Sequence, residues 1–481
     1  MSKQKISAYS RRKILTTSAG LAVSAALPNF GWASTGSSPT DIRLVAAAGK
    51  RKLDPAFPEA SSILTFNGSI PGPEIRIPQG SNLTVTVDNQ LSEATTVHWH
   101  GVRTPNAMDG VPYLTQKPIL PQSSHTYKFK AIDAGTYWYH PHMRSYEQVG
   151  RGLYGSLIIE EKNPIRVDRD VTWMLDDWRL EKTGEIQDNF GNKHDMSHNG
   201  RIGNFVTING KRLDKFPVQK GERLRLRLIN AANARIFALD FQGHSPVVIA
   251  MDGQPIEPHK PDGGLVILGP AMRIDLILDL QQENGSNHGI IDRSYKGLEY
   301  QLTSLDYATR PLRNHKPDWG IKLPSNNLPE PDIQNAKRHE VLFHGGMMGG
   351  MILRNMGIKS TKPASMMGMM HSKNIWYING VAAEGSIMDP MLKLDINRSH
   401  ILQMTNATAW HHPIHLHGHS FKVLTRNGKP TKYQEWQDTV IMAPKETVEI
   451  AFVADNPGDW MFHCHILEHA ASGMMGVIRV A

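Results

Sequence analysis

Apolar residues recur at every second position in three separated stretches of this chain, the pattern of a β-strand that buries one face. Each stretch follows an Asn-Gly pair and closes on another asparagine, and together they read Asn67-Gly68 with Gly80 to Asn89, Asn209-Gly210 with Gly221 to Asn230, and Asn379-Gly380 with Asn397 to Asn406. A unit repeated at domain-sized spacing indicates related domains. We therefore predict an all-β protein of three tandem Greek-key β-sandwich domains.

Turn-rich segments mark the expected domain boundaries. The Asn163-Pro164 pair ends the first alternating region, and a proline- and asparagine-rich stretch separates the second from the third. These positions predict domain 1 over residues 41–164, domain 2 over 165–310, a linker over 311–335 and domain 3 over 336–481.

The first 33 residues differ in composition from the rest. Ser10-Arg11-Arg12-Lys13 precedes an apolar stretch that runs to Leu27, and small residues follow near Ala33. This order resembles a twin-arginine signal peptide, which the Tat export machinery recognises and which exports folded proteins to the periplasm. The alternative is a disordered basic tail.

Charge and cysteine content exclude several classes of protein. The formal net charge is +8, and the five basic residues of segment 1–33, which holds no acid, leave about +3 for the remainder. That balance gives no argument for nucleic-acid binding. No run of 18 uninterrupted apolar residues predicts a membrane span, so we expect no stable membrane insertion. Cys464 is the only cysteine, so no disulfide can form within the chain.

A second repeat relates domains 1 and 3. The segment from Gly135 to His142 matches the segment from Gly458 to His465 position for position, and a Gly-x-x-Gly strand follows each. Because related domains that have diverged act as internal controls, they separate the positions that serve the fold from those that serve chemistry.

Histidines form four clusters: His98-Trp-His100, His140-Pro-His142, His412-Pro-Ile-His415-Leu-His417, and His463-Cys464-His465 with His469 and Met474 nearby. Residues i and i+2 of a strand share a face, so each His-x-His pair aims two imidazoles at one place. Cys464 must point away from its neighbours into a second site. Joined there by His412, His469 and Met474, it gives the ligand set of an electron-transfer copper.

These motifs resemble the multicopper oxidase family of laccases, bilirubin oxidases and periplasmic cuprous oxidases. The resemblance covers nearly the whole chain after residue 33 and implies cupredoxin-like domains with four coppers. Type 1 copper would bind His412, Cys464, His469 and Met474, and type 2 copper would bind His98 and His415. The two type 3 coppers would bind His100, His140 and His465, and His142, His417 and His463.

The repeats also predict where copper is absent. Domain 1 has Pro141 in the place of Cys464 and Leu153 in the place of Met474, so it should lack a type 1 site. Domain 2 has Asp240 and Gln242 where domain 3 has His415 and His417, and it should be copper-free. His419 has a counterpart, His244, in that domain, which favours a structural role for both.

Reduction of O2 to water needs four protons, so the copper cluster requires nearby acids. The resemblance implies Glu468 and Asp109 as proton-relay residues, with a surface carboxylate and a turn-forming Asp-Gly as the structural alternatives. It also implies that Asp438 lies near the type 1 histidines, in reach of a reducing substrate. A structural hydrogen-bonding role for Asp438 is an equal alternative.

Residues 347–370 contain eight of the 22 methionines, interleaved with glycine. This composition favours a flexible exposed loop, and thioethers are soft ligands that suit Cu(I). Adaptable packing over a domain interface is the alternative.

These features together predict a periplasmic, monomeric oxidase that transfers single electrons from Cu(I) or phenolic donors to O2 in copper tolerance. A general laccase without that role is one alternative, and a copper-free structural relative is another, which the complete ligand sets disfavour. A copper nitrite reductase is excluded, because that class does not need histidines on both sides of the cysteine.

Overall fold

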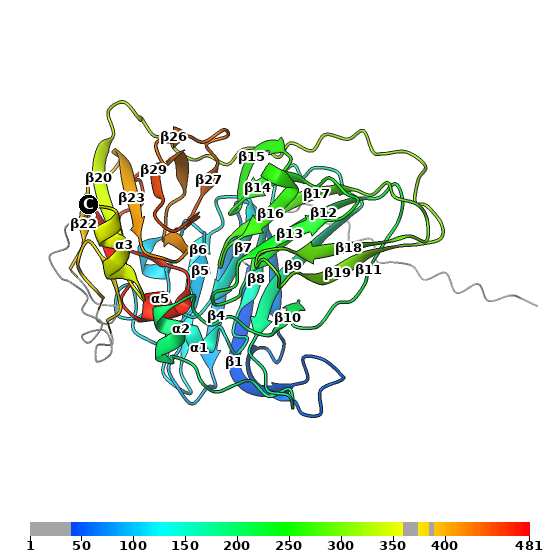
Figure 1. The fold of residues 1–481 in the computed structure, drawn as a ribbon, viewed down its shortest axis with the longest axis horizontal. Coiled ribbons are helices and arrows are strands. Elements are labelled where there is room, and N and C mark those ends of the chain that lie inside the picture. Colours follow the sequence, from blue (N-terminus) through cyan, green and yellow to red (C-terminus); the bar gives the residue numbers. More distant parts are fainter. Residues whose placement is uncertain (1–39, 359–373, 384–388) are drawn as a thin grey trace, which may run out of the picture. The chain divides into compact units, whose positions relative to one another are not determined.

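The structure is a computed structural model that describes residues 40–358, 374–383 and 389–481. In it, six β-sheets make up three cupredoxin-like domains, as predicted (Figure 1). The expected signal segment 1–33 lies outside the described residues, as do residues 359–370 of the methionine segment.

Domain 1 is a sandwich of two four-stranded sheets around one apolar core. The first sheet has the order β2 (Ser61–Phe66), β1 (Thr40–Arg51), β4 (Asn82–Asn89), β6 (Ser124–Lys130), and the second β3 (Gly72–Pro78), β8 (Gly155–Glu160), β7 (Gly135–His140), β5 (His98–His100). Leu83, Val85 and Val87 alternate with partly exposed residues along β4, as the sequence pattern predicts.

Domain 2 pairs a six-stranded with a five-stranded sheet. The first runs β10 (Phe205–Ile208), β9 (Arg169–Trp178), β12 (Arg223–Asn230), β17 (Arg273–Asp279), β14 (Val247–Met251), β15 (Gln254–His259), and the second β11 (Phe216–Val218), β19 (Tyr300–Tyr307), β18 (Asn287–Asp292), β13 (Phe237–Phe241), β16 (Leu265–Leu268). The two faces enclose a core of leucines, isoleucines and valines.

Domain 3 follows after residues 308–336, which form no helix or strand. Its larger sheet has the order β21 (Trp376–Ile378), β20 (Lys337–Gly345), β23 (Ser399–Ala407), β29 (Thr447–Val453), β25 (Phe421–Arg426), β26 (Lys429–Pro430), with β27 (Trp436–Gln437) also paired to β25. The smaller sheet has the order β22 (Leu392–Leu394), β31 (Met475–Val480), β30 (Gly458–Cys464), β24 (His412–Leu416), β28 (Thr439–Met442).

The asparagine that closes each repeated strand has the same role in all three domains. Its side chain is buried and donates to two backbone carbonyls, those of Glu93 and Ile119 for Asn89, of Arg235 and Leu268 for Asn230, and of Trp410 and Ala443 for Asn406. Each also accepts from the amide two residues onward. The repeat therefore reflects one hydrogen-bonding device that fixes a loop in each domain.

One strand departs from the expected half-buried pattern. All eight residues of β12 are buried, including Arg225 and Arg227. Arg225 binds Glu161 and Asp275, while Arg227 binds Asp170 and the Thr136 hydroxyl. The outer face of β12 carries charges because domain 1, which contributes Thr136 and Glu161, covers it.

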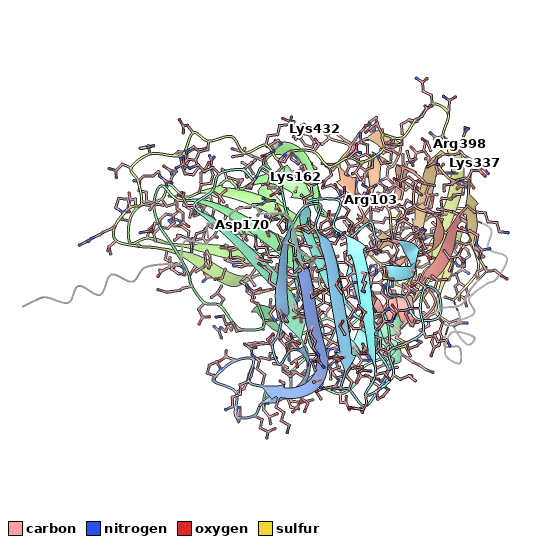
Figure 2. All side chains as sticks on the ribbon, turned by 180° about the vertical axis from the view of Figure 1, so that it is seen from behind. Arg103, Lys162, Asp170, Lys337, Arg398 and Lys432 are labelled. Atoms are coloured by element: carbon pink, nitrogen blue, oxygen red, sulfur yellow. The ribbon has the colours of Figure 1, made fainter. Side chains whose placement is uncertain are left out.

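Arg103 joins three parts of the chain. It forms ion pairs with Asp133 of domain 1 and Asp455 of domain 3, at 2.7 and 3.2 Å, and donates to the backbone carbonyl of Asn327. Figure 2, which shows the molecule from behind relative to Figure 1, labels Arg103. The segment predicted as a linker is thus held to domain 1, and Arg103 joins the same place to domain 3.

The helices are short: α1 (Ser145–Gln148), α2 (Lys193–Ser197), α3 (Gly349–Asn355), α5 (Leu467–Ala471), and the 3-10 turns η1 (Asn106–Met108) and η2 (Asp262–Gly264). The prediction that residues 347–370 form an exposed loop is wrong at α3. There the chain forms a helix, and the helix buries Ile352 and Leu353. Within the described residues, no helix has the length and apolar content to cross a membrane.

Candidate metal centres

Two strand pairs present eight histidines to one buried volume. In domain 1, β5 and β7 place His98 opposite His140, and in domain 3, β24 and β30 place His415 opposite His463. The partner of each follows two residues later in the chain: His100 within β5, and His142, His417 and His465 just beyond the ends of β7, β24 and β30. Seven of the eight side chains are buried, and that of His142 is partly exposed.

The ring nitrogens of these histidines converge in groups of three. His100, His140 and His465 form one group, His98, His142 and His417 a second, and His98, His100 and His415 a third, with the atoms of each group within 4.8 Å of one another. His463 joins the second group, because its Nε2 lies 3.1 Å from that of His417. The predicted cluster ligands therefore all meet, half of them from domain 1 and half from domain 3.

The chemistry of this set fits metal ions. Burial lowers the pKa of seven of these rings, to about 3 for His463 and well below the usual value for His100 and His140, which favours the neutral ring that offers a lone pair. Five buried ring nitrogens have no hydrogen-bond partner: those at His98 Nε2, His100 Nδ1, His142 Nε2, His415 Nε2 and His465 Nδ1. Unpartnered buried nitrogens are costly unless a metal takes them.

Asp109 orients two of these rings. Its Oδ2 lies 2.9 Å from Nδ1 of His417, and its Oδ1 lies 3.2 Å from Nδ1 of His98, whose Nδ1 is also 2.7 Å from the Asp109 carbonyl. A ring that donates from Nδ1 presents the lone pair of Nε2 to a metal. Asp109 thus touches a predicted type 2 ligand and a predicted type 3 ligand from opposite domains.

Asp438 lies elsewhere than the family resemblance implied. It is wholly buried, so it cannot contact a reducing substrate, and its Oδ1 lies 3.4 Å from Nδ1 of His415 and 3.3 Å from Nε2 of His100. Both are ligands of the histidine cluster, not of the cysteine site. The placement beside the type 1 histidines is therefore wrong, and the alternative, a hydrogen-bonding role, agrees with the contacts.

Arg273 of domain 2 fixes Asp438. Its two terminal nitrogens bind the two carboxylate oxygens at 2.7 and 2.6 Å, and all these atoms are buried. Burial by itself would raise the pKa of Asp438, but the guanidinium outweighs it and holds that pKa well below its usual range. Asp252, on the other side of Arg273, has its pKa raised by burial and by Asp438. Asp438 is thus a fixed anion behind His415.

A second site forms on the opposite face of β30. The Cys464 Sγ lies 3.4 Å from Nδ1 of His412 and 3.7 Å from Nδ1 of His469, and these two nitrogens are 3.1 Å apart. All three side chains and that of Met474 are buried. Burial raises the pKa of the thiol, which would release its proton on binding a metal. The predicted set therefore meets as His412, Cys464 and His469, with Met474 buried beside them.

The Nε2 atoms of His412 and His469, which point away from the cysteine sulfur, are held by hydrogen bonds with domain 3 and domain 2 respectively. Nε2 of His412 lies 2.8 Å from the Thr408 hydroxyl, and Nε2 of His469 donates to the backbone carbonyl of His198 at 2.7 Å. Trp376 packs on both rings, and its indole N–H donates to the carbonyl of Met196. Domain 2 therefore covers the cysteine site through the end of α2.

Glu468 lies buried on α5, between the two sites. Its Oε1 accepts from the Asn233 amide at 2.9 Å, while its Oε2 has no hydrogen-bond partner. Burial raises the pKa of this carboxyl, and the Asn233 hydrogen bond only partly opposes that effect. A raised pKa favours the protonated carboxyl, which can donate a proton, and this agrees with the predicted proton role.

Within the described residues, no group of three potential ligands comes from domain 2. Asp240, the counterpart of His415, pairs with Arg293. His419 and His244 both bind the backbone carbonyl two residues before them through Nδ1, and their Nε2 atoms face Asn456 and Tyr307. These matching bonds agree with the structural role inferred from the repeat.

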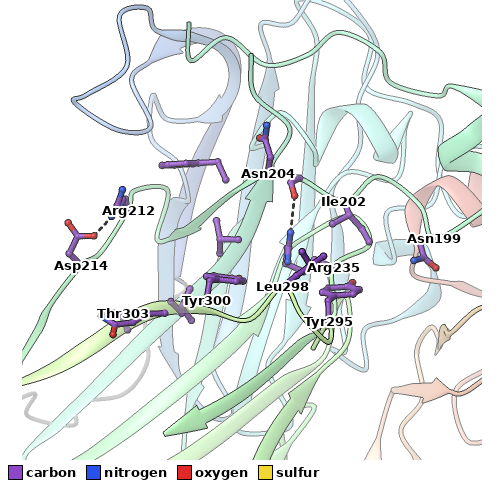
Figure 3. Close-up of a pocket in the computed structure, with 15 residues that line it drawn as sticks. Asn199, Ile202, Asn204, Arg212, Asp214, Arg235, Tyr295, Leu298, Tyr300 and Thr303 are labelled. Carbon is purple, nitrogen blue, oxygen red and sulfur yellow. Dashed lines mark hydrogen bonds and ion pairs between the residues drawn. The ribbon is translucent and has the colours of Figure 1, made fainter. Parts of the chain in front are cut away.

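Two cavities lie beside these centres. One of about 290 Å³ is lined by His142 and His463 of the cluster and by Tyr113, whose side chain is exposed. The other, of about 890 Å³, lies in domain 2 and is lined by Asn199, Phe205, Tyr295 and Tyr300. Figure 3 shows Tyr295 beside the Arg235 guanidinium, which is 5.6 Å from the ring centre.

Comparisons with known proteins agree with this arrangement. Multicopper oxidase family models match residues 49–164, 169–301 and 359–481. Multicopper oxidase MmcO of Mycobacterium tuberculosis is 31% identical over 446 residues, which cover 86% of this chain and 82% of that protein. The chain belongs to the multicopper oxidase family.

Solved structures of other multicopper oxidases share the fold. That of the enzyme from Pseudomonas thermotolerans superimposes with a TM-score of 0.80 at 32% identity, covering 92% of this chain and all of that one. The structure described as a multicopper oxidase from Campylobacter jejuni, a metallo-oxidase, gives a TM-score of 0.75 at 28% identity, covering 92% and 91%. The chain is accordingly a laccase-like oxidoreductase whose histidine clusters are consistent with the copper sites of multicopper oxidases.

Sequence reasoning missed the groups that support the ligands from other domains. Neither Arg273 nor the His198 carbonyl was singled out, because their contacts join residues far apart in the chain. The sequence does draw attention to the segment around His198. His194 and His198 stand four residues apart, a spacing known from metal-binding helices, in a domain without predicted copper ligands.

Replacing Cys464 by serine tests the cysteine site. We expect the intense blue absorption and donor oxidation to be lost, because a hydroxyl does not replace the thiolate. The trinuclear coppers should still bind, since their eight histidines are unchanged. Absorption spectra and copper analysis check this, and a variant that stays blue would contradict the assignment.

Replacing Glu468 by glutamine tests the proton role, because the amide keeps the shape but cannot ionise. We expect reduction of the type 1 centre by a donor to persist, while O2 turnover falls by about a hundredfold, the usual contribution of a general acid. Stopped-flow reduction and O2 consumption over a range of pH separate the two steps. Unchanged turnover at every pH would rule out the role.

Proposed function

We propose that this multicopper oxidase takes single electrons from Cu(I) or phenolic donors at a type 1 copper and reduces O2 to water at a trinuclear cluster. The observation that carries the proposal is the convergence of eight histidines, together with a separate cysteine site whose Cys464 lies next to cluster residue His463 on strand β30. When bound, four coppers would supply one-electron acceptance and four-electron reduction of O2.

The assignment of ligands follows the resemblance residue by residue. Type 1 copper is held by His412, Cys464, His469 and Met474, and type 2 copper by His98 and His415. One type 3 copper takes His100, His140 and His465, and the other takes His142, His417 and His463. Two observations support this division. The ring nitrogens of His100, His140 and His465 converge, and the Nε2 atoms of His417 and His463 lie 3.1 Å apart.

The protein residues have separate tasks in this scheme. Asp109 and Asp438 orient the histidines they touch, and Glu468 holds a proton near the cluster. The Cys464 carbonyl accepts from Nδ1 of His463 at 2.9 Å, which joins the cysteine to a cluster ligand in addition to the peptide bond. The cavity that reaches His142 and His463 gives O2 and water a path.

Two features support Cu(I) and aromatic compounds as the electron donors. The methionine segment 347–370 offers eight soft thioethers, and the related Campylobacter jejuni protein is described as a metallo-oxidase. The domain 2 cavity, with aromatic side chains at Phe205, Tyr295 and Tyr300, suits an aromatic donor. Its wall includes Asn199, which follows the residue whose carbonyl binds His469. A general laccase without a role in copper tolerance remains the alternative.

The location and cellular role follow from the N-terminal segment. The twin-arginine pattern in residues 1–33 supports export by the Tat machinery to the periplasm, where a folded monomer that oxidises Cu(I) would contribute to copper tolerance.

Donor rates on copper-loaded protein test this function. We expect about four coppers per chain, an intense blue colour, and oxidation of Cu(I) at limiting concentration faster than that of phenols or aromatic diamines. O2 consumption with each donor, on protein of known copper content, gives the comparison. Fast phenol oxidation without Cu(I) oxidation would favour the laccase alternative, and copper-free protein would contradict the proposal.

The methionine segment can be tested without removing helix α3. Changing Met366, Met367, Met369 and Met370 to leucine removes four sulfurs and keeps the apolar volume. If these thioethers capture Cu(I), its oxidation at limiting concentration should fall by about tenfold, equal to about 1.4 kcal/mol of weaker capture.

Phenol oxidation by the same variant is the control, because it needs no thioether. A packing role predicts that both rates and the melting temperature stay close to those of the unchanged protein, since leucine packs like methionine. Equal Cu(I) rates in the two proteins would therefore end the capture hypothesis.

A further inference from the structure

His194 of helix α2 and His198, the residue that follows the end of the helix, are two histidines that the copper assignment does not use. His194 and His198 stand one turn apart, and their rings stack with centres 4.2 Å apart. The His194 side chain is largely exposed, and that of His198 is partly exposed. His198 caps the C-terminus of α2 four residues after His194, and the stacking of the two rings shows that both side chains lie on one side of the helix end. Histidine pairs at this spacing bind metals on helices.

The opposite side of α2 is anchored, so the pair stands on a fixed support. The Asn192 side chain caps the helix by accepting from the Asp195 amide at 3.0 Å. Asp195 is buried and binds both terminal nitrogens of Arg179, at 2.7 and 3.1 Å. The two histidines therefore face outward from an element that cannot easily turn.

The hydrogen bonds of His198 leave one nitrogen available for a metal. Its Nδ1 donates to the His194 carbonyl at 3.0 Å and also lies 2.9 Å from the Ser197 hydroxyl, so Nε2 is the ring nitrogen that can offer a lone pair to a metal. Metal-binding histidines usually donate their other ring nitrogen to a carbonyl in this way. Imidazole nitrogen is a suitable ligand for copper.

The backbone of His198 contacts the cysteine site directly. Its carbonyl accepts from Nε2 of His469 at 2.7 Å, and His469 lies within 3.7 Å of the Cys464 sulfur. Ser197 also accepts from the amide of Met347, the first residue of the methionine segment. The pair thus lies between the start of the thioether segment and a predicted type 1 ligand.

We propose that His194 and His198 form a binding site for substrate Cu(I), the place from which its electron enters the protein. This inference rests on the proposed oxidase function. Each bound Cu(I) gives up one electron and leaves as Cu(II). Four such electrons, with four protons, reduce one O2 to two waters. The electron has the His198 peptide and one hydrogen bond to cross before it reaches His469.

Binding can be measured apart from turnover with Ag(I), a redox-inert ion that has the same charge as Cu(I) and a similar preference for ligands. On copper-loaded protein, we expect His194→Ala to bind one Ag(I) fewer than the unchanged chain, or to bind that ion at least about tenfold more weakly. His315→Ala is the matched control, because it removes an exposed histidine outside the pair. Equal Ag(I) binding by all three proteins would overturn the site.

Oxidation rates then test electron entry. His194→Ala leaves the His198 carbonyl and every predicted copper ligand in place, so phenol oxidation and the blue absorption should match those of the unchanged protein. Cu(I) oxidation at limiting concentration should fall by about tenfold or more. An unchanged Cu(I) rate would refute entry at this pair. Failure of the proposed function would look different, because the unchanged protein would then oxidise neither donor.

Discussion

The whole structure depends on bringing eight imidazoles from two domains into one largely buried volume. Seven of the eight side chains are buried, and burial lowers the pKa of rings such as His100, His140 and His417, which disfavours their protonation inside the cluster. Their lone pairs then face one another across distances near 3 Å, as at His417 and His463. Such an arrangement is stable only if metal ions fill it and neighbouring groups hold each ring in place.

Domain 2 supplies much of that support although it contributes no ligand. Arg273 binds Asp438 behind His415, while Arg225 and Arg227 bind the acids of the face that meets domain 1. A buried ion pair is weak as a source of stability, because desolvating two charges costs nearly as much as their attraction returns. Its value here is geometric, since a guanidinium that binds both carboxylate oxygens permits one orientation of Asp438. The domain that contributes no ligand to these clusters thus positions the ligands that the other two contribute.

The sequence carries those parts of this arrangement that depend on local spacing. The Asn-Gly turns and closing asparagines identify three domains because each asparagine bonds within its own domain, and a His-x-His pair on a strand needs no distant information to share a face. Contacts between domains have no such local sign. From the sequence, the buried arginines of β12 fall on the side of the strand expected to be exposed, and the family resemblance puts Asp438 within reach of a substrate. Only packing against a neighbouring domain reverses both interpretations.

The same dependence on domain packing shapes how electrons can reach the cysteine site. If Nε2 of His469 were open to solvent, a donor could contact this ligand directly. The shape of the surrounding surface would then do little to select among donors. Here the His198 carbonyl occupies that position, and Trp376 covers the two ligand rings. In the proposed function, domain 2 offers a donor two approaches, the face of α2 and the cavity that Asn199 lines. Because one approach carries imidazoles and the other aromatic rings, the proposed copper site could accept electrons from both a metal ion and an organic donor without either binding to its ligands.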